Sequence, residues 1–132
     1  MKKKKVLDSF ALLAYLKMEG KYKKVKDLLV SEGVLLLMNE INVGETFYIL
    51  ARERGLEKAE YFVNTILPSL PIETVPNTLH DVIEAARIKT THSISYADCF
   101  VVATAFRENA AIITGDPEFK KVQKAVEIEW MV

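Results

Sequence analysis

The chain has 132 residues, a usual size for one domain, and half of them are hydrophobic. Eighteen basic and eighteen acidic residues give a formal net charge of zero, which excludes a strongly basic nucleic-acid-binding protein and leaves only local basic patches. The single cysteine, Cys99, excludes an internal disulfide and a cysteine-based metal cluster. We therefore expect one domain, residues 1–132, with a sizeable hydrophobic core.

The N-terminal stretch is basic but does not have the pattern of a secretion signal. The apolar segment after "MKKKK" is short and is interrupted by Asp8. No apolar run approaches the length of a membrane span. We therefore expect a soluble cytoplasmic protein that does not associate with membranes.

Short apolar runs alternate along the chain with segments of helical periodicity. In chain order the expected elements are a strand (4–8), two helices (9–20, 22–33), a strand (34–38), two helices (39–55, 56–67), a strand (72–75), a helix (78–90), a helix that begins at Ser95, a strand (110–114), a short helix (115–125) and a strand (126–130). This alternation predicts an α/β domain around a mostly parallel sheet.

The five aspartates differ in their surroundings. Asp27 and Asp81 lie in polar helical segments, whereas the other three stand beside apolar runs. Asp8 closes the first strand, and Asp116 lies two residues beyond the fourth. Ligands bind parallel sheets at the carboxyl ends of the strands, where the strand order reverses. On the working assumption of the order 3-2-1-4-5, Asp8 and Asp116 would share one cleft.

Two of these carboxylates also have a local explanation. Asp98 heads the nearly apolar helix of "SISYADCFVVATAF", and "SYAD" fits a capping box in which Ser95 is the N-cap and Asp98 bonds back to its amide. Asp8 fits a polar strand end, and Ser9 is a candidate N-cap for the next helix. Both interpretations stay open at this stage.

Glu45 and Asp116 have similar alternatives. Asn42 and Glu45 are three residues apart and fit a second capping box. Asp116 fits an N-cap with Pro117 at the first helical position. Local capping does not explain why all four acids stand at places that parallel topology brings to one edge of a sheet.

Carboxylates gathered in one cleft repel each other. At about 4 Å and an effective dielectric constant near 20, each pair costs roughly 4 kcal/mol, and a domain is stable by only about 5–15 kcal/mol. Protonation, a basic partner or a divalent cation must compensate. Oxygen ligands favour Mg²⁺ or Mn²⁺, and His80 and His92 are predicted to be separate surface residues. Such a metal suits hydrolysis of phosphate esters.

Four segments together resemble a known family. "VLDSFALLAYL", "NEINVGETFYIL", "ISYADCFVVATA" and "IITGDPEFKKV" are similar, in order and spacing, to the signature segments of PIN domains, specifically the VapC-type toxins of bacterial and archaeal toxin–antitoxin pairs. The resemblance runs from Val6 to Val126. It implies a three-layer fold with a five-stranded, mostly parallel sheet in the order 3-2-1-4-5 flanked by helices. It also implies a metal-dependent endoribonuclease, usually a homodimer, inhibited by a small antitoxin whose tail covers the site.

The resemblance carries over to individual residues. Asp8, Asp98 and Asp116 match the metal-binding aspartates of the family. Glu45 matches its helical glutamate, which often acts through metal-bound water. All four acids that the family uses for catalysis are present, so the resemblance implies an active enzyme with Mg²⁺ or Mn²⁺ as cofactor and RNA as substrate.

Ser9 and Thr114 match supporting positions of the family, and capping or turn hydrogen bonds are their alternative. Three rival functions remain: a PIN-fold nuclease for RNA processing or for DNA without an antitoxin, a non-catalytic binding module that holds a structural cation, and a metal-dependent phosphatase. The phosphatase usually needs an aspartate two residues after the first, where this chain has Phe10.

Overall fold

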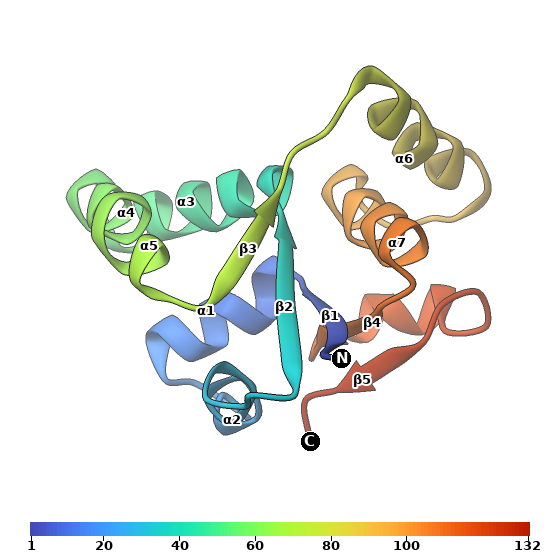
Figure 1. Ribbon diagram of the computed structural model, residues 1–132. Helices are drawn as coiled ribbons and strands as arrows, with labels where there is room; N and C mark the ends of the chain where they lie inside the picture. The colour runs from blue at the N-terminus through green and yellow to red at the C-terminus, as the bar shows by residue number, and fades with distance from the viewer.

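The computed structural model describes all residues from Met1 to Val132. Its centre is a five-stranded sheet in the order β3-β2-β1-β4-β5, and every neighbouring pair of strands is parallel (Figure 1). The strands are β1 (Lys3–Leu7), β2 (Val34–Asn39), β3 (Ile72–Val75), β4 (Ala111–Thr114) and β5 (Ile128–Trp130). The α/β fold and the strand order are confirmed.

The helices lie where the periodicity predicts them. They are α1 (Ser9–Lys17), α2 (Lys23–Leu29), α3 (Glu40–Arg54), α4 (Leu56–Tyr61), a π-helical turn (Phe62–Ile66), α5 (Leu67–Ser69), α6 (Leu79–Thr91), α7 (Tyr96–Glu108) and a 3₁₀-helix (Pro117–Val122). None of them is both long and apolar enough to cross a membrane.

Three predicted helix ends differ from the structure. The first helix stops at Lys17, before Gly20, because Met18 adopts a left-handed conformation (φ 52°) that ends the helical hydrogen bonding. The second stops at Leu29 rather than near Gly33. The helix expected to close at Pro68 instead passes it, because proline sits in the first turn of α5, where its missing N–H has no intrahelical partner.

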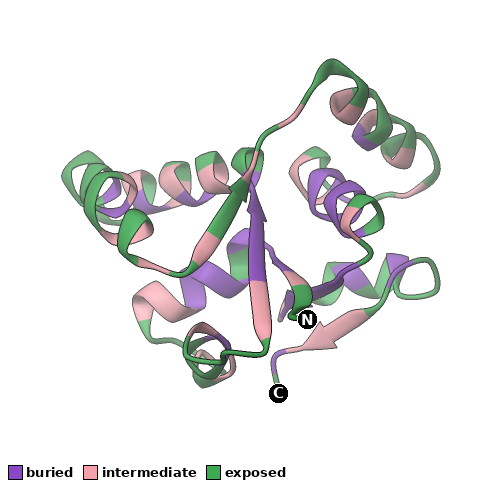
Figure 2. Ribbon diagram, viewed as in Figure 1, coloured by how far each residue is buried: buried purple, intermediate pink, exposed green.

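The pleat of the central strands divides the core between two helical layers. Val6 and Ile112 face the cluster built on α6 and α7, whereas Leu7 and Ile113 face the cluster built on α1 and α2. A third cluster joins α1 to α3 and α4. Figure 1 shows α6 and α7 on one side of the sheet and α1 to α5 on the other. Figure 2 shows that the buried positions concentrate in the inner strands, α1 and α7.

The topology places the ends of two central strands side by side. β1 and β4 pair through Leu7 and Ile113, and the Asp8 amide donates to the Ile113 carbonyl at 3.4 Å. The order reverses at this pair, because β1 leads to β2 on one side while β4 and β5 lie on the other. Residues that follow β1 and β4 therefore emerge together at the carboxyl edge of the sheet.

Candidate active site

One pocket collects the four acids that the sequence predicts to meet. It has a volume of about 310 Å³ and opens where α1, α3, the start of α7 and the 3₁₀-helix converge at the carboxyl edge of the sheet. Its lining is Asp8, Ser9, Phe10, Leu13, Glu45, Ile49, Ser95, Asp98, Asp116 and Glu118. Thr114 lies behind this lining, fully buried, in contact with Asp8.

Asp8 is both the floor of the pocket and the cap of α1. Its side chain is 2% exposed, and its Oδ1 accepts from the Ala11 amide at 2.8 Å. The N-cap of α1 is therefore Asp8, and the prediction that Ser9 caps this helix is wrong. Asp8 has the extended backbone of an N-cap (φ −89°, ψ 175°), so Ser9 becomes the first helical residue and its hydroxyl is free for another partner.

Thr114 connects the ends of β1 and β4. Its hydroxyl donates to Asp8 Oδ2 at 2.5 Å and accepts from the Asp116 amide at 3.0 Å. Asp116 Oδ1 accepts from the Glu118 amide at 3.0 Å, with Pro117 as the first residue of the 3₁₀-helix. The predicted N-cap at Asp116 is confirmed, and the Thr114 hydroxyl contacts both the Asp8 carboxylate and the Asp116 backbone.

Glu45 projects from α3 toward α1. Ser9 Oγ donates to Glu45 Oε1 at 2.6 Å, so the two predicted residues are hydrogen-bonded to each other. The capping box predicted for Asn42 and Glu45 is wrong: α3 begins three residues earlier, with Asn39 as its N-cap. Asn42 is fully buried inside the helix, and its Nδ2 donates to the Ala97 carbonyl of α7 at 3.0 Å.

Asp98 stands in the first turn of α7 with only half of a capping box. Ser95 Oγ accepts from the Asp98 amide at 3.1 Å, but the Asp98 carboxylate makes no return bond to the Ser95 amide. At the start of α6, Thr78 and Asp81 form both bonds of the same motif. Capping therefore explains Ser95 and leaves the carboxylate of Asp98 unexplained.

A sequence model of the PIN domain matches residues 5–125. The chain belongs to the PIN domain family. No curated protein matches it. Among solved structures, VapBC2 from Rickettsia felis, bound to a DNA fragment from its promoter, is 18% identical with a TM-score of 0.73, covering 96% of this chain and 98% of that one.

Two further solved structures resemble this PIN domain. Mycobacterium tuberculosis VapC20, described as a sarcin–ricin loop cleaving toxin, is 17% identical with a TM-score of 0.73, covering 88% of this chain and 92% of that one. FitAcB from Neisseria gonorrhoeae is 19% identical with a TM-score of 0.71, covering 95% and 96%. At such identities the likeness is one of fold.

The electrostatics of the PIN-domain pocket disfavour ionised aspartate. Burial raises the pKa of Asp8 to about 7, and Asp98 and Asp116 add repulsion, against the opposing hydrogen bonds from Thr114 and Ala11. Burial also raises the pKa of Asp98 to about 6, and the charges of neighbouring acids contribute further. No Lys or Arg forms an ion pair with the four acids. The repulsion among the four carboxylates must therefore be relieved by protonation or by a cation from outside the chain.

The pocket offers a divalent metal oxygen donors but no closed set of ligands. No three His, Cys, Asp or Glu side chains are close enough together to coordinate one ion directly. The pocket offers oxygen ligands only, and His80 and His92 do not line it. Mg²⁺ commonly keeps several waters and uses one or two carboxylates with substrate phosphates. The residues thus fit Mg²⁺ or Mn²⁺ in donor chemistry, although they do not form a closed protein cage.

Sequence reasoning missed two contributors to the site. Glu118 lines the pocket, and its charge helps to raise the pKa of Asp98. Its position two residues after Asp116 in the sequence could have indicated that it lies at the same site. Asn42 ties α3 to α7, and nothing in the local sequence predicts that bond because its acceptor, Ala97, is 55 residues away.

Proposed function

We propose that this PIN domain is a metal-dependent endoribonuclease that hydrolyses RNA phosphodiester bonds with Mg²⁺ or Mn²⁺. The observation that carries the proposal is the convergence of Asp8, Glu45, Asp98 and Asp116 on one pocket without a basic partner. Unpaired carboxylates at one site are costly unless they serve a cation. A structural neighbour described as a sarcin–ricin loop cleaving toxin supports RNA as the substrate.

Each acid has a distinct role in this mechanism. Asp8, Asp98 and Asp116 would hold the ion in part through the water molecules that Mg²⁺ keeps, since no three of these side chains are close enough to coordinate it directly, and Thr114 orients the Asp8 carboxylate. Ser9 holds Glu45 through Oε1, which leaves Oε2 to accept a proton from an attacking water. A bound ion would supply a lowered pKa of that water and positive charge against the phosphate oxygens.

Cleavage of a mixed single-stranded RNA pool with Mg²⁺ or Mn²⁺ tests the activity. Asp116→Asn should lower the rate at least about 100-fold, the usual scale for losing one electrostatic element of an active site, and EDTA should abolish cleavage. Asp27→Asn is the matched control, because Asp27 is exposed on α2 and forms no ion pair. Cleavage that survives EDTA, or an equal loss in both variants, would contradict the proposal. Single-stranded DNA of the same sequence separates RNA from DNA specificity.

The protein is further proposed to be the toxin of a toxin–antitoxin pair and to act as a homodimer in the cytoplasm. VapBC complexes among the structural neighbours support a small antitoxin as partner. Lys121 pairs with Glu118 at the rim, but the four predicted acids have no ion-pair partner, so they are suited to a guanidinium or ammonium group from that partner. Inhibition by a co-expressed partner should weaken as Mg²⁺ rises, and the affinity of the partner should fall in an Asp98→Asn, Asp116→Asn double variant. Equal affinity in all conditions would place the partner elsewhere.

A further inference from the structure

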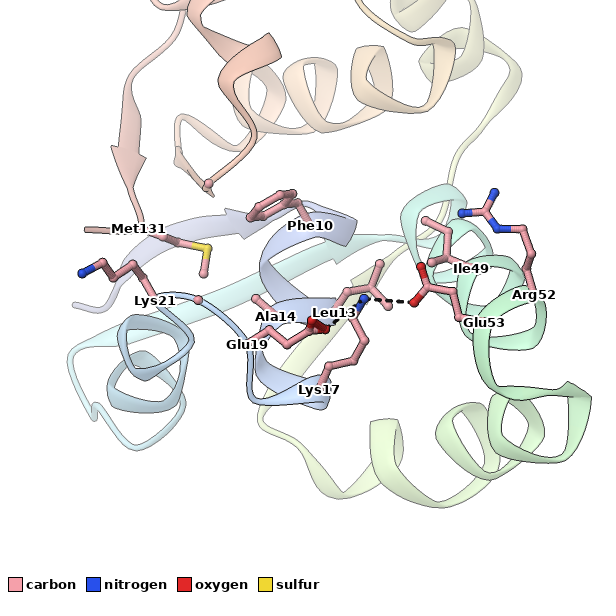
Figure 3. A pocket seen from close by; sticks show the side chains of 12 residues that line it. Phe10, Leu13, Ala14, Lys17, Glu19, Lys21, Ile49, Arg52, Glu53 and Met131 are labelled. Carbon is pink, nitrogen blue, oxygen red and sulfur yellow. Dashed lines mark hydrogen bonds and ion pairs between the residues drawn. The ribbon is translucent and has the colours of Figure 1, made fainter.

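A second cavity adjoins the pocket that holds the four acids, here called the carboxylate pocket. Unlike that pocket, it is lined by basic as well as acidic side chains. It has a volume of about 490 Å³ and lies between α1, the turn that follows it and α3 (Figure 3). It shares Phe10, Leu13 and Ile49 with the carboxylate pocket. A polymer held at the carboxylates would therefore continue into this cavity, whose size is that of a small-ligand site.

Three cations line this second cavity, and two of them have no carboxylate partner. Lys17 is paired with Glu19 at 3.3 Å and with Glu53 at 3.0 Å. Lys21 and Arg52 are exposed and form no ion pair. Figure 3 shows them at opposite ends of the cavity. Arg52 lies over the Tyr48 ring at 5.4 Å, but neither cation has a carboxylate partner, and two such cations beside a cluster of acids point to a ligand with separated anionic groups.

Phe10 lies between these two cations and borders both cavities (Figure 3). Its side chain is 44% exposed, so the core uses only part of the ring. A Cβ on Gly115 would come within 2.6 Å of Phe10 Cε1. The absence of a side chain at Gly115 thus lets the ring lie against the segment that carries Thr114 and Asp116. The result is an aromatic surface held next to the proposed reaction site.

We propose that this cavity is a nucleotide subsite of the ribonuclease, which takes the unpaired nucleotide next to the scissile phosphate. The base stacks on Phe10, and the phosphates on its two sides contact Lys21 and Arg52. Every base has a face that stacks on an aromatic ring, so this contact favours single strands without reading sequence. The inference rests on the proposed function and adds residues that lie outside the four acids.

The test measures binding of a labelled 12-nucleotide single-stranded RNA by fluorescence anisotropy with Mg²⁺. All proteins carry Asp116→Asn so that the RNA stays intact. Phe10→Ala should weaken binding about 10-fold, the scale of one stacked base, and Phe10→Tyr should preserve it. Binding of an RNA duplex should not respond to Phe10→Ala, because its bases are already stacked. Tyr61→Ala, an exposed aromatic on α4, is the control.

Salt dependence isolates the two cations. Replacing Lys21 and Arg52 with alanine should reduce the slope of log affinity against log salt by about 1.4, because each phosphate contact on a single strand contributes about 0.7. Lys58→Ala with Lys124→Ala is the matched control, since both lysines are exposed and lie outside the cavity. An equal slope change in the control pair would overturn the assignment of the two cations.

Gly115→Ala adds a double-mutant cycle. If the added Cβ acts by displacing the Phe10 ring, Gly115→Ala should weaken RNA binding in the presence of Phe10 and add nothing to Phe10→Ala.

Wild-type protein that cuts RNA, together with Phe10→Ala protein that binds RNA equally well, would overturn the subsite alone. Wild-type protein that cuts no RNA would reject the proposed function and the subsite with it. Loss of a protein partner's affinity in Phe10→Ala without loss of RNA affinity would assign the cavity to that partner.

Discussion

Two aspartates with the same sequence motif have different surroundings, and this contrast separates scaffold from site. Thr78 and Asp81 form a complete capping box, and Asp81 also pairs with Arg107 at 2.9 Å. Ser95 and Asp98 form only half of the box, and the Asp98 carboxylate faces other acids instead. At the residue scale, the same three-residue spacing therefore gives an aspartate that caps its helix in one place and an aspartate that faces the pocket in the other.

Asparagine at each position should reveal this difference. Asp98→Asn removes one charge from a repulsive cluster, so metal-free protein should melt at the same or a higher temperature while cleavage collapses. Asp81→Asn removes an ion pair and leaves only a neutral acceptor for the Thr78 amide, so it should lower the melting temperature and leave cleavage intact. Thermal unfolding in EDTA and the RNA assay check both variants. A destabilised Asp98→Asn protein with normal cleavage would restore the capping interpretation.

The raised pKa of Asp8 predicts a pH dependence of stability. The folded pKa is about 7 and the unfolded value is near 4, so the folded state binds more protons between these values. Stability of the metal-free protein should therefore fall as pH rises from 5 to 8, by an amount of the order of a few kcal/mol. Asp8→Asn should flatten the profile. Denaturant unfolding at each pH measures it, and a profile that rises over this range in wild-type protein would contradict the raised pKa.

At the scale of elements, the site depends on the relative placement of helices from distant parts of the chain. Glu45 lies on α3 and Asp98 on α7, and Asn42 bridges these helices through the Ala97 carbonyl. No protein group donates to Asn42 Oδ1, which is buried. The Asn42 side chain therefore makes one hydrogen bond between the helices. We expect this bond to matter more for the placement of Glu45 and Asp98 than for the stability of the fold.

Asn42→Leu should separate stability from function. The variant loses one hydrogen bond, worth about 1 kcal/mol, and keeps a side chain of similar size. Without the bond to Ala97, α7 loses a constraint that sets Asp98 against Glu45, so kcat/KM should fall about 10-fold, since small misplacements of reacting groups are costly. Asn64→Leu, at an exposed position of the π-helical turn, is the control. Unchanged cleavage by Asn42→Leu would show that the helices hold their places without it.

The whole molecule has no net charge, yet its charges are separated in space. Glu118 joins the four predicted acids in one pocket, while the cavity beside it contains three cations and two glutamates. The reversal of strand order produces this separation, because it brings the ends of β1 and β4 together and opens the pocket between two helical layers. Overall charge therefore carries no information about this site.

Divalent cations should stabilise the folded protein as a whole. A ligand that binds only the native state adds RT ln(1 + [L]/Kd), about 2.7 kcal/mol at a concentration 100 times Kd. Mn²⁺ or Mg²⁺ should raise the melting temperature of wild-type protein, and Asp8→Asn or Asp116→Asn should reduce the shift. Asp27→Asn should not. An equal metal response in all of these proteins would place the cation outside the pocket.

The sequence by itself determined the elements and the residue types of the site. Apolar periodicity is a local property, so it located all five strands and the main helices, and the acids beside apolar runs were visible as candidates. The strand order came from resemblance, since no local pattern encodes which strands pair. Only the tertiary structure decided the partners: Ser9 with Glu45 and Thr114 with Asp8 are 36 and 106 residues apart. A hydroxyl or carboxylate takes either a local cap or a distant partner, and the packing of the helices on the sheet determines which one is within reach.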